Sequence, residues 1–292
     1  MTTERRGIAR VPPPLLVLGA AGTVQVSAAI ARGQFDRIGP AGTVFLRMAF
    51  GAAMLVALWR PRVAGRDRRD LALAGLFGLA LAGMNLTFYE AIDRIPLGIA
   101  VTIEFAGPLA VAVAGSRRRL DLLWVVLAAG GIVLLARGGA GHANLAGVAF
   151  ALAAAGFWAS YILLSQRVGR TFPGGGGLAL AMVVGGVALV PFGVAGGGSD
   201  LLGVEPLAVG ALIALLGSAI PYSLELEALR RLPARVFGIL LSLDPVIAAL
   251  AGLALLGQDL GAREVAGIGM VVAASVGATA TVAEREGAVP LA

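Results

Sequence analysis

The chain has 292 residues, of which 58% are hydrophobic and only 14% are charged, and its mean hydropathy is +0.90. A soluble domain carries about 25% charged residues, so this composition excludes an ordinary soluble protein. The net charge is +6, and all of the basic residues are arginines. Because these arginines border apolar stretches, we assign them to anionic membrane lipid and expect no nucleic-acid partner.

Ten apolar stretches follow one another along the chain. A helix needs about 20 apolar residues to cross the hydrocarbon core of a bilayer. The sequence therefore predicts an all-α integral membrane protein with ten transmembrane helices. Their expected ranges are 12–30, 39–59, 71–92, 95–115, 120–136, 144–166, 177–195, 206–229, 232–256 and 264–283.

The loops between these stretches alternate between many arginines and few. With a cytoplasmic N-terminus, 17 arginines fall on the cytoplasmic side, 5 fall on the outer side, and Arg47 lies inside a span. Cytoplasmic loops carry the excess of basic residues in membrane proteins. The pattern predicts that both termini are cytoplasmic, with a short N-terminal segment at 1–11 and a tail at 284–292.

The sequence repeats weakly at an offset of 137 residues. The informative matches are Glu90 with Glu227, Arg94 with Arg231, Pro96 with Pro233, and Pro108 with Pro245. Five spans separate the two copies, so equivalent helices would run in opposite directions. Such inverted repeats are typical of transporters, and we place them at 12–136 and 144–283. The alternative is a coincidence within an apolar sequence of low complexity.

Glu104 and Asp244 stand near the middle of predicted spans, and Arg47 lies well inside another. A charge at the centre of a bilayer costs about 2.5–3.5 kcal/mol, so these side chains should face a shared interior. An amino-acid zwitterion needs a carboxylate for its ammonium group and a guanidinium for its own carboxylate. We expect Glu104 or Asp244 to receive the ammonium group or to exchange a proton, and Arg47 to hold the substrate carboxylate. The alternative is an ion pair between Arg47 and Glu104 or Asp244 that only locks the helices together.

Prolines accompany these charges in both halves. Pro108 follows Glu104 by four residues, and Pro245 directly follows Asp244. Proline removes a helix hydrogen bond and frees a carbonyl group, so matching prolines predict interrupted helices at a transport site. We predict breaks or hinges at Pro108, Pro245, Pro96 and Pro233, with plain helix kinks as the alternative.

Further polar and aromatic residues inside the spans are candidates for lining a substrate cavity. They are Gln25, Ser27, Asn85, Trp158, Ser160, Tyr161, Tyr222 and Glu225. Serine and asparagine also serve helix–helix hydrogen bonding, which is the competing interpretation. Glu90, Asp93 and Glu227 lie near helix ends, where we expect them to reach the headgroups or to pair with neighbouring arginines.

Nothing in the sequence indicates an enzyme. The chain has no cysteine, its only histidine is His142 in a glycine-rich loop, and it has no Gly-Lys-Ser/Thr phosphate-binding loop. We predict no catalytic residues, no metal and no cofactor.

The segments around both proline pairs resemble the EamA-type drug/metabolite transporter superfamily, and within it the bacterial threonine/homoserine exporters. The resemblance rests on GMN at 83–85, PLGIAV at 96–101, EFAGPLAVA at 104–112, PYSLE at 221–225, ALRRLP at 228–233, FG at 237–238 and DP at 244–245. It covers essentially the whole chain in helix number, and it departs from the family at Asp244, where glutamate is expected.

The resemblance implies a secondary transporter that exports small amino acids across the bacterial inner membrane by alternating access, driven by protons. The implied substrates are similar to threonine and homoserine, with a range that extends to other neutral or aromatic amino acids. The alternative on the same fold is an exporter of drugs or other metabolites. A channel is disfavoured, because single buried carboxylates beside broken helices suit alternating access better.

Overall fold

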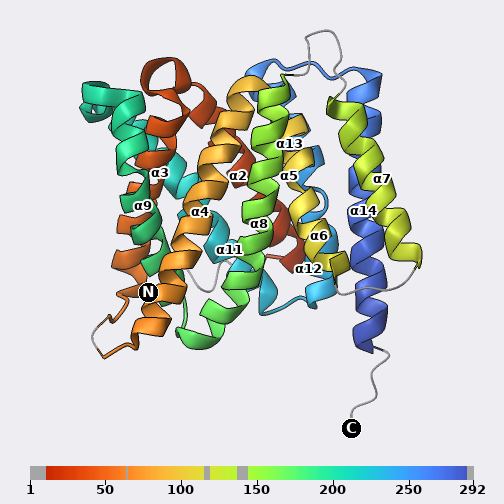
Figure 1. Cartoon of the computed structure of the whole chain (residues 1–292), viewed down its shortest axis with the longest axis horizontal. Helices are drawn as coiled ribbons and strands as arrows, with labels where there is room; N and C mark the ends of the chain where they lie inside the picture. The colour runs from red at the N-terminus through yellow and green to blue at the C-terminus, as the bar shows by residue number, and fades with distance from the viewer. Residues whose placement is uncertain (1–10, 64, 115–118, 137–143, 288–292) are drawn as a thin grey trace.

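A computed structural model describes residues 11–63, 65–114, 119–136 and 144–287. The secondary structure of these residues is entirely helical (Figure 1). The first half contains α2 (Pro13–Arg32), α3 (Phe35–Trp59), α4 (Arg68–Arg94), α5 (Leu97–Glu104), α6 (Ala106–Ala114) and α7 (Arg119–Ala136). The second contains α8 (Leu145–Thr171), α9 (Gly176–Gly197), η1 (Gly198–Leu202), α10 (Val204–Ala214), η2 (Leu215–Ala219), α11 (Ile220–Leu229), α12 (Ala234–Leu241), α13 (Asp244–Leu256) and α14 (Ala262–Gly287).

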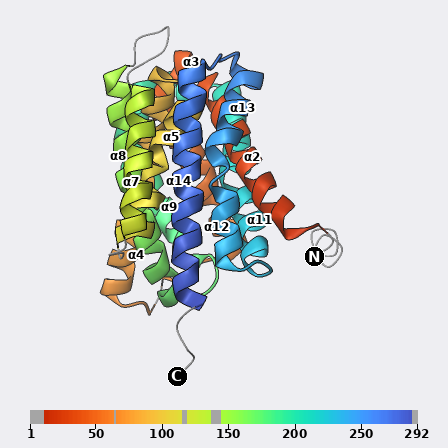
Figure 2. The same cartoon turned by 90° about the vertical axis from the view of Figure 1, so that its right-hand side faces the viewer.

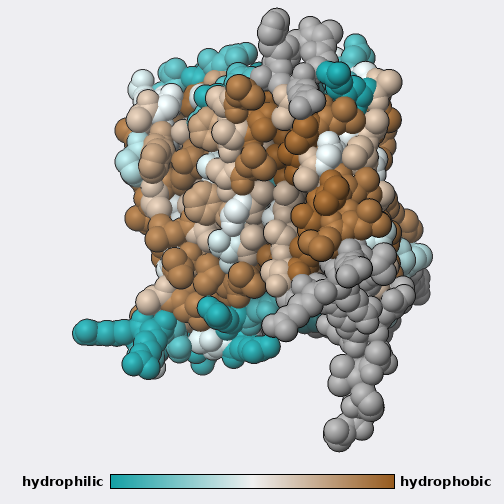
Figure 3. All heavy atoms as spheres, turned by 45° about the vertical axis from the view of Figure 1, so that its right-hand side comes forward, coloured by the Kyte–Doolittle hydropathy of each residue, from teal (hydrophilic) through white to brown (hydrophobic). Residues whose placement is uncertain are grey.

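The helices form an upright bundle with an apolar exterior. In the described part of the chain, eight helical segments are long and apolar enough to cross a membrane, and 122–136 is a shorter apolar helix. On the face shown in Figure 3, apolar side chains cover the middle, and hydrophilic ones gather at the two ends. Such a belt is suited to lipid tails, and it identifies a multi-pass membrane protein.

Two of the predicted spans are each interrupted near their middle. The span expected at 95–115 consists of α5 and α6, which meet at Phe105, and the span expected at 232–256 consists of α12 and α13, separated by Ser242 and Leu243. These breaks coincide at the offset of 137 residues. Each precedes a proline, because Pro108 and Pro245 cannot donate a hydrogen bond to the carbonyl group four residues earlier.

Pro96 and Pro233 do not interrupt a helix, contrary to the prediction. They are the N-cap residues of α5 and α12. Proline is tolerated at a helix start, where its missing N–H has no helical partner in any case. Pro96 and Pro233 therefore begin the two broken spans, and the interruptions lie further along them.

Two other spans also differ from continuous helices. The helix expected from residue 39 begins at Phe35 and bends at Gly39, whose positive φ of 68° precedes Pro40. The helix expected at 206–229 contains the π-helical turn η2 between α10 and α11. A π-turn inside a helix is uncommon and often marks a functional site.

Helices far apart in sequence pack side by side. The pairs α3 with α9, α4 with α8, α5 with α13 and α7 with α14 are all in contact. Figures 1 and 2 show α7 and α14 together at one side of the bundle. Glycine permits the closest approaches: a Cβ atom at Gly78 would lie 2.4 Å from the carbonyl oxygen of Ala181.

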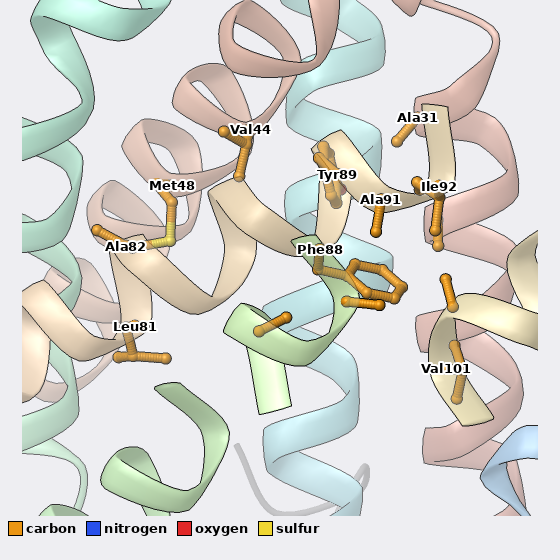
Figure 4. Packing of buried hydrophobic residues seen from close by; sticks show 14 of the residues in the cluster. Ala31, Val44, Met48, Leu81, Ala82, Phe88, Tyr89, Ala91, Ile92 and Val101 are labelled. Carbon is orange, nitrogen blue, oxygen red and sulfur yellow. The ribbon is translucent and has the colours of Figure 1, made fainter. Parts of the chain in front are cut away.

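A large apolar core joins the first half of the chain to α8 and α9. Figure 4 shows part of it, with Val44 and Met48 of α3 beside Leu81, Ala82 and Tyr89 of α4. Tyr89 is completely buried in this core. Since Arg47 precedes Met48 on α3, the core holds the helix that carries the arginine.

Several sequence predictions lie outside the described residues. They concern the N-terminal arginines Arg5, Arg6 and Arg10, the loop arginines Arg117 and Arg118, Arg137, and His142.

Candidate functional site

A cavity of about 420 Å³ lies inside the bundle. Its walls come from α2, α3, α4, α5, α6, α8, η2, α11, α12, α13 and α14. All nine residues predicted to bind substrate or protons contribute to its lining: Gln25, Arg47, Asn85, Glu104, Trp158, Tyr161, Tyr222, Glu225 and Asp244. The helices thus bring together side chains that lie as much as 219 positions apart in the sequence, from Gln25 to Asp244.

Arg47 projects from α3 and is held by neighbouring helices. Its Nη1 atom donates to Asn85 Oδ1 at 2.6 Å, and its Nη2 atom donates to the carbonyl oxygen of Gly217 at 2.8 Å. The guanidinium carbon also lies 5.7 Å from the ring centre of Tyr89. Asn85 in turn donates to the carbonyl oxygen of Leu81 at 2.9 Å, which fixes its amide. The arginine is therefore oriented before any ligand binds.

The structure does not contain the ion pair considered as an alternative. Among the described residues, no salt bridge joins Arg47 to Glu104 or to Asp244. Glu104 is nevertheless in electrostatic range of both Asp244 and Arg47. The two Nη atoms of Arg47 thus donate to neutral partners, so its charge is not neutralised by direct pairing with either carboxylate.

Three acidic side chains occupy the cavity. Glu104 is the last residue of α5 and Asp244 is the first residue of α13, so both stand at the helix breaks. Glu225 on α11 lies within electrostatic range of Asp244. Gln25 on α2 lines the same cavity. The breaks therefore place carboxyl groups from different spans around one space.

Three buried polar atoms in the cavity have no hydrogen-bond partner among the described residues. They are Arg47 Nε, Asp244 Oδ1 and Gln25 Oε1. An unpaired buried polar atom costs about 1–3 kcal/mol, so most native structures avoid it. One of these atoms is a cationic donor and two are acceptors. Together they can receive a ligand that carries both an anionic and a donor group.

Aromatic side chains form a further part of the wall. Trp158 on α8 packs edge-on against Phe105, with ring centres 5.2 Å apart, and Tyr161 stacks on Phe77 at 5.2 Å. Phe88 and Phe237 also line the cavity. This wall offers apolar contact to the part of a ligand that carries no charge.

The predicted prolines divide into two groups. Pro108 lines the cavity, whereas Pro96, Pro233 and Pro245 are not among its lining residues. The prolines at 108 and 245 leave the carbonyl groups of Glu104 and Leu241 without an i+4 donor. Both of these residues line the cavity, so each proline frees a backbone carbonyl group at a residue of the site.

The two serines considered as lining residues have structural positions. Ser27 is buried and donates to the carbonyl oxygen of Ile213 at 2.8 Å. Ser160 is exposed, donates to the carbonyl oxygen of Gly156, and lies at a separate groove between α4 and α8. Neither lines the central cavity.

The acidic residues near helix ends pair with arginines, as predicted. Glu90 bonds to Arg94 at 2.6 Å, Asp93 lies 3.5 Å from Arg32, and Glu227 lies 3.6 Å from Arg230. These groups are outside the cavity lining and are assigned to structure.

Sequence reasoning missed the contribution of α14. Ser275, Ala278 and Thr279 line the cavity, and Ser275 Oγ lies 2.7 Å from Ser242 Oγ at the α12–α13 break. The i, i+4 spacing of Ser275 and Thr279 in an apolar helix was an available signal, because it places two hydroxyl groups on one face. Gly217 and Pro221 were also missed, although a proline inside a span marks a freed carbonyl group.

Comparison with known proteins places this cavity in a transporter. The sequence profile of the EamA-like transporter family matches residues 145–280. The threonine/homoserine exporter RhtA of Salmonella typhimurium (strain LT2) is 41% identical over 275 residues, which cover 92% of each chain. This chain belongs to the EamA-like transporter family. The family assignment agrees with the resemblance found in the sequence, and it identifies a transporter rather than an enzyme.

Other relatives agree with this assignment. The threonine/homoserine exporter RhtA of Escherichia coli (strain K12) is 40% identical over 92% of both chains. The uncharacterized transporter YwfM of Bacillus subtilis (strain 168) is 26% identical over 76% of this chain and 78% of that one. A solved crystal structure superimposes with a TM-score of 0.63 over 94% of this chain and 98% of the other, at 19% sequence identity. This last similarity concerns the fold alone.

Proposed function

We propose that this protein exports small neutral amino acids, similar to threonine and homoserine, across the bacterial inner membrane. The observation that carries the proposal is the set of unpaired atoms in the cavity: Arg47 Nε, Asp244 Oδ1 and Gln25 Oε1. The substrate carboxylate accepts from Arg47, and its ammonium group donates to Asp244 and Gln25. The two RhtA relatives, named as threonine/homoserine exporters, support this substrate class.

We assign separate roles to the remaining lining residues. Glu104 and Glu225 supply carboxyl groups beside the ammonium site, and acidic groups inside a helix bundle often mark proton pathways. We assign Glu104 to proton exchange coupled to export. Trp158, Tyr161 and Tyr222 contact the substrate side chain, and their aromatic surface extends the range to larger neutral amino acids.

The proposed architecture is ten transmembrane helices in two inverted repeats, at 12–136 and 144–283, with short cytoplasmic segments at 1–11 and 284–292. Support comes from the breaks after α5 and α12, which coincide at the offset of 137 residues. Further support is that α2 begins and α14 ends towards the same side of the bundle (Figure 2). Exchange of conformation between the repeats would open the cavity to each side in turn.

Efflux of labelled threonine and homoserine from proteoliposomes, with and without an imposed pH gradient, tests the proposal. We expect saturable flux that the gradient accelerates. Glu104→Gln should remove the acceleration, whereas Glu90→Gln, which changes a half-buried carboxylate at a helix end, should keep it. Flux of the same rate with and without the gradient would support the proposed substrate and contradict the proposed proton coupling. Absence of flux with folded protein would favour a drug or another metabolite as the substrate.

A further inference from the structure

The unusual π-turn η2 lies beside Arg47. It covers Leu215–Ala219, and the N–H of Ile220 at its end donates to the carbonyl oxygen of Leu215, five residues earlier. Pro221 follows directly and has no N–H to donate. In a regular helix, the N–H of a non-proline residue at position 221 would donate to the carbonyl oxygen of Gly217, four residues earlier. The carbonyl group of Gly217 is consequently free to accept from elsewhere.

The donor that reaches this carbonyl group is Arg47 Nη2, at 2.8 Å. The approach also depends on the lack of a side chain at Gly217. A Cβ atom there would lie 2.6 Å from Ser27 Oγ, 3.0 Å from Arg47 Nε and 3.2 Å from Arg47 Cζ. Contacts under 3.0 Å force a neighbour to move, and Ser27 is fixed by its bond to Ile213.

We infer that Gly217 and Pro221 are positioning residues for Arg47. Proline frees the carbonyl group, and glycine leaves room for the guanidinium plane. With Nη2 held by Gly217 and Nη1 held by Asn85, the Nε–H edge remains for a carboxylate. A guanidinium held in one orientation binds a carboxylate more strongly than it binds a neutral amide, because its hydrogen bonds to the carboxylate are charge-assisted. The inference rests on the proposed role of Arg47 as the carboxylate ligand.

Pro221→Ala tests the first part of this device. The new N–H competes with Arg47 for the Gly217 carbonyl group, and the guanidinium loses one of its two short hydrogen bonds. We expect KM for threonine counterflow to rise about tenfold, with little change in Vmax. Pro191→Ala is the matched control, because Pro191 lies inside α9 and does not line the cavity.

The decisive readout is the ratio of inhibition by threonine to inhibition by threonine amide. A general packing defect would weaken both compounds equally and leave this ratio unchanged. If the carboxylate ligand is no longer positioned, only inhibition by threonine should weaken. The ratio should therefore fall about tenfold in Pro221→Ala and stay at the wild-type value in Pro191→Ala. An unchanged ratio in Pro221→Ala would overturn the inference.

Gly217→Ala tests the second part. The added methyl group meets both Ser27 and Arg47, and we expect an equal or larger fall in the same ratio. Combining it with Ser27→Ala removes the contact with the hydroxyl group and retains the contact with Arg47. The ratio should therefore stay low in the double variant. Full recovery in the double variant would show that Gly217 acts on Ser27 and would overturn its assignment as a positioning residue for Arg47.

Arg47→Gln separates this inference from the proposed function. If this variant keeps the wild-type preference for threonine over its amide, the role of Arg47 in the proposed function fails. If Arg47→Gln loses the preference while Pro221→Ala and Gly217→Ala keep it, the proposed function stands and the positioning role fails.

Discussion

The helix α4 and the segment 204–229, which corresponds to it at the offset of 137 residues, approach Arg47 in different ways. α4 is one continuous helix of 27 residues, and it offers the side-chain oxygen of Asn85. The segment 204–229 is divided into α10, η2 and α11, and it offers the backbone oxygen of Gly217. A regular helix uses its backbone carbonyl groups internally, so only a side chain can serve a ligand. A helix broken at a proline gains a backbone acceptor instead.

The two segments also differ in how they pack. Gly78 on α4 lies against the backbone of α9, where a Cβ atom would contact Ala181. The residue at the corresponding place in the other segment is Leu215, whose side chain is 41% exposed. At this position α4 therefore packs against a neighbouring helix, whereas the segment 204–229 is exposed. This difference indicates that α4 is the more closely packed wall of the cavity, and it suggests experiments that exchange features between the segments.

Met84→Pro would give α4 the proline that the other segment has at 221. In α4 no π-turn accommodates the missing hydrogen bond, so we expect a loss of about 3 kcal/mol or more in the free energy of unfolding. Thermal unfolding in detergent measures the effect. Pro221→Ala should unfold at or above the wild-type temperature. Equal unfolding temperatures for Met84→Pro and wild type would contradict the distinction between the two segments.

Arg47→Gln removes the side chain that both segments bind. The oxygens of Asn85 and Gly217 lose their donor, and the cavity loses its cation, so we expect transport of threonine to fall at least a hundredfold, about 3 kcal/mol. Initial rates of counterflow measure this, with insertion checked by gel filtration in detergent. Arg94→Gln is the control, because Arg94 is half-exposed and pairs with Glu90 at the end of α4. A comparable loss in both variants would indicate a general effect of removing arginine.

Asn85→Ala removes only the contact from the continuous helix. Arg47 keeps the Gly217 carbonyl group, and its Nη1 atom retains only the weak contact with Tyr89 at 3.5 Å. A hydrogen bond to a charged group contributes about 1.5–3 kcal/mol, so KM should rise about tenfold or more. Measured beside Pro221→Ala, this variant compares the side-chain acceptor with the backbone acceptor. Wild-type KM in Asn85→Ala would show that α4 does not orient the arginine.

Gly78→Ala tests the packing difference and has the smallest expected effect. The methyl group must displace the backbone of α9, so we expect a destabilisation of about 1–2 kcal/mol. Leu215→Ala changes the corresponding residue at an exposed position, where substitutions usually change stability by about 0.5 kcal/mol or less. Thermal unfolding of both variants gives the comparison. The reverse order of stability would contradict the assignment of α4 as the more closely packed wall.

Much of this arrangement could be predicted from the sequence. The described residues form helices as predicted, and eight of the helical segments are long and apolar enough to cross a membrane, because length and hydropathy decide where a chain can cross a bilayer. Glu104, Asp244 and Arg47 were expected to share an interior, since an isolated charge is costly in lipid. All three line the same cavity.

Other features depend on tertiary contacts that no single segment reveals. The helix breaks lie before Pro108 and Pro245 rather than at them, because the missing hydrogen bond disturbs the preceding turn. Arg47 binds Asn85 and Gly217 rather than a carboxylate, and this depends on how α3 packs between its neighbours. The place of Ser275 and Thr279 in the lining follows from the packing of α14 against α12 and α6.

We propose that the cavity recognises both charges of an amino acid. The most direct test of this proposal is competition against labelled threonine counterflow in proteoliposomes, by threonine, threonine amide and 3-hydroxybutyrate, which lacks the amino group. We expect threonine to compete strongly and both analogues to compete at least tenfold more weakly, since each leaves Arg47 or Asp244 without its partner. Equal competition by all three compounds would contradict the proposal.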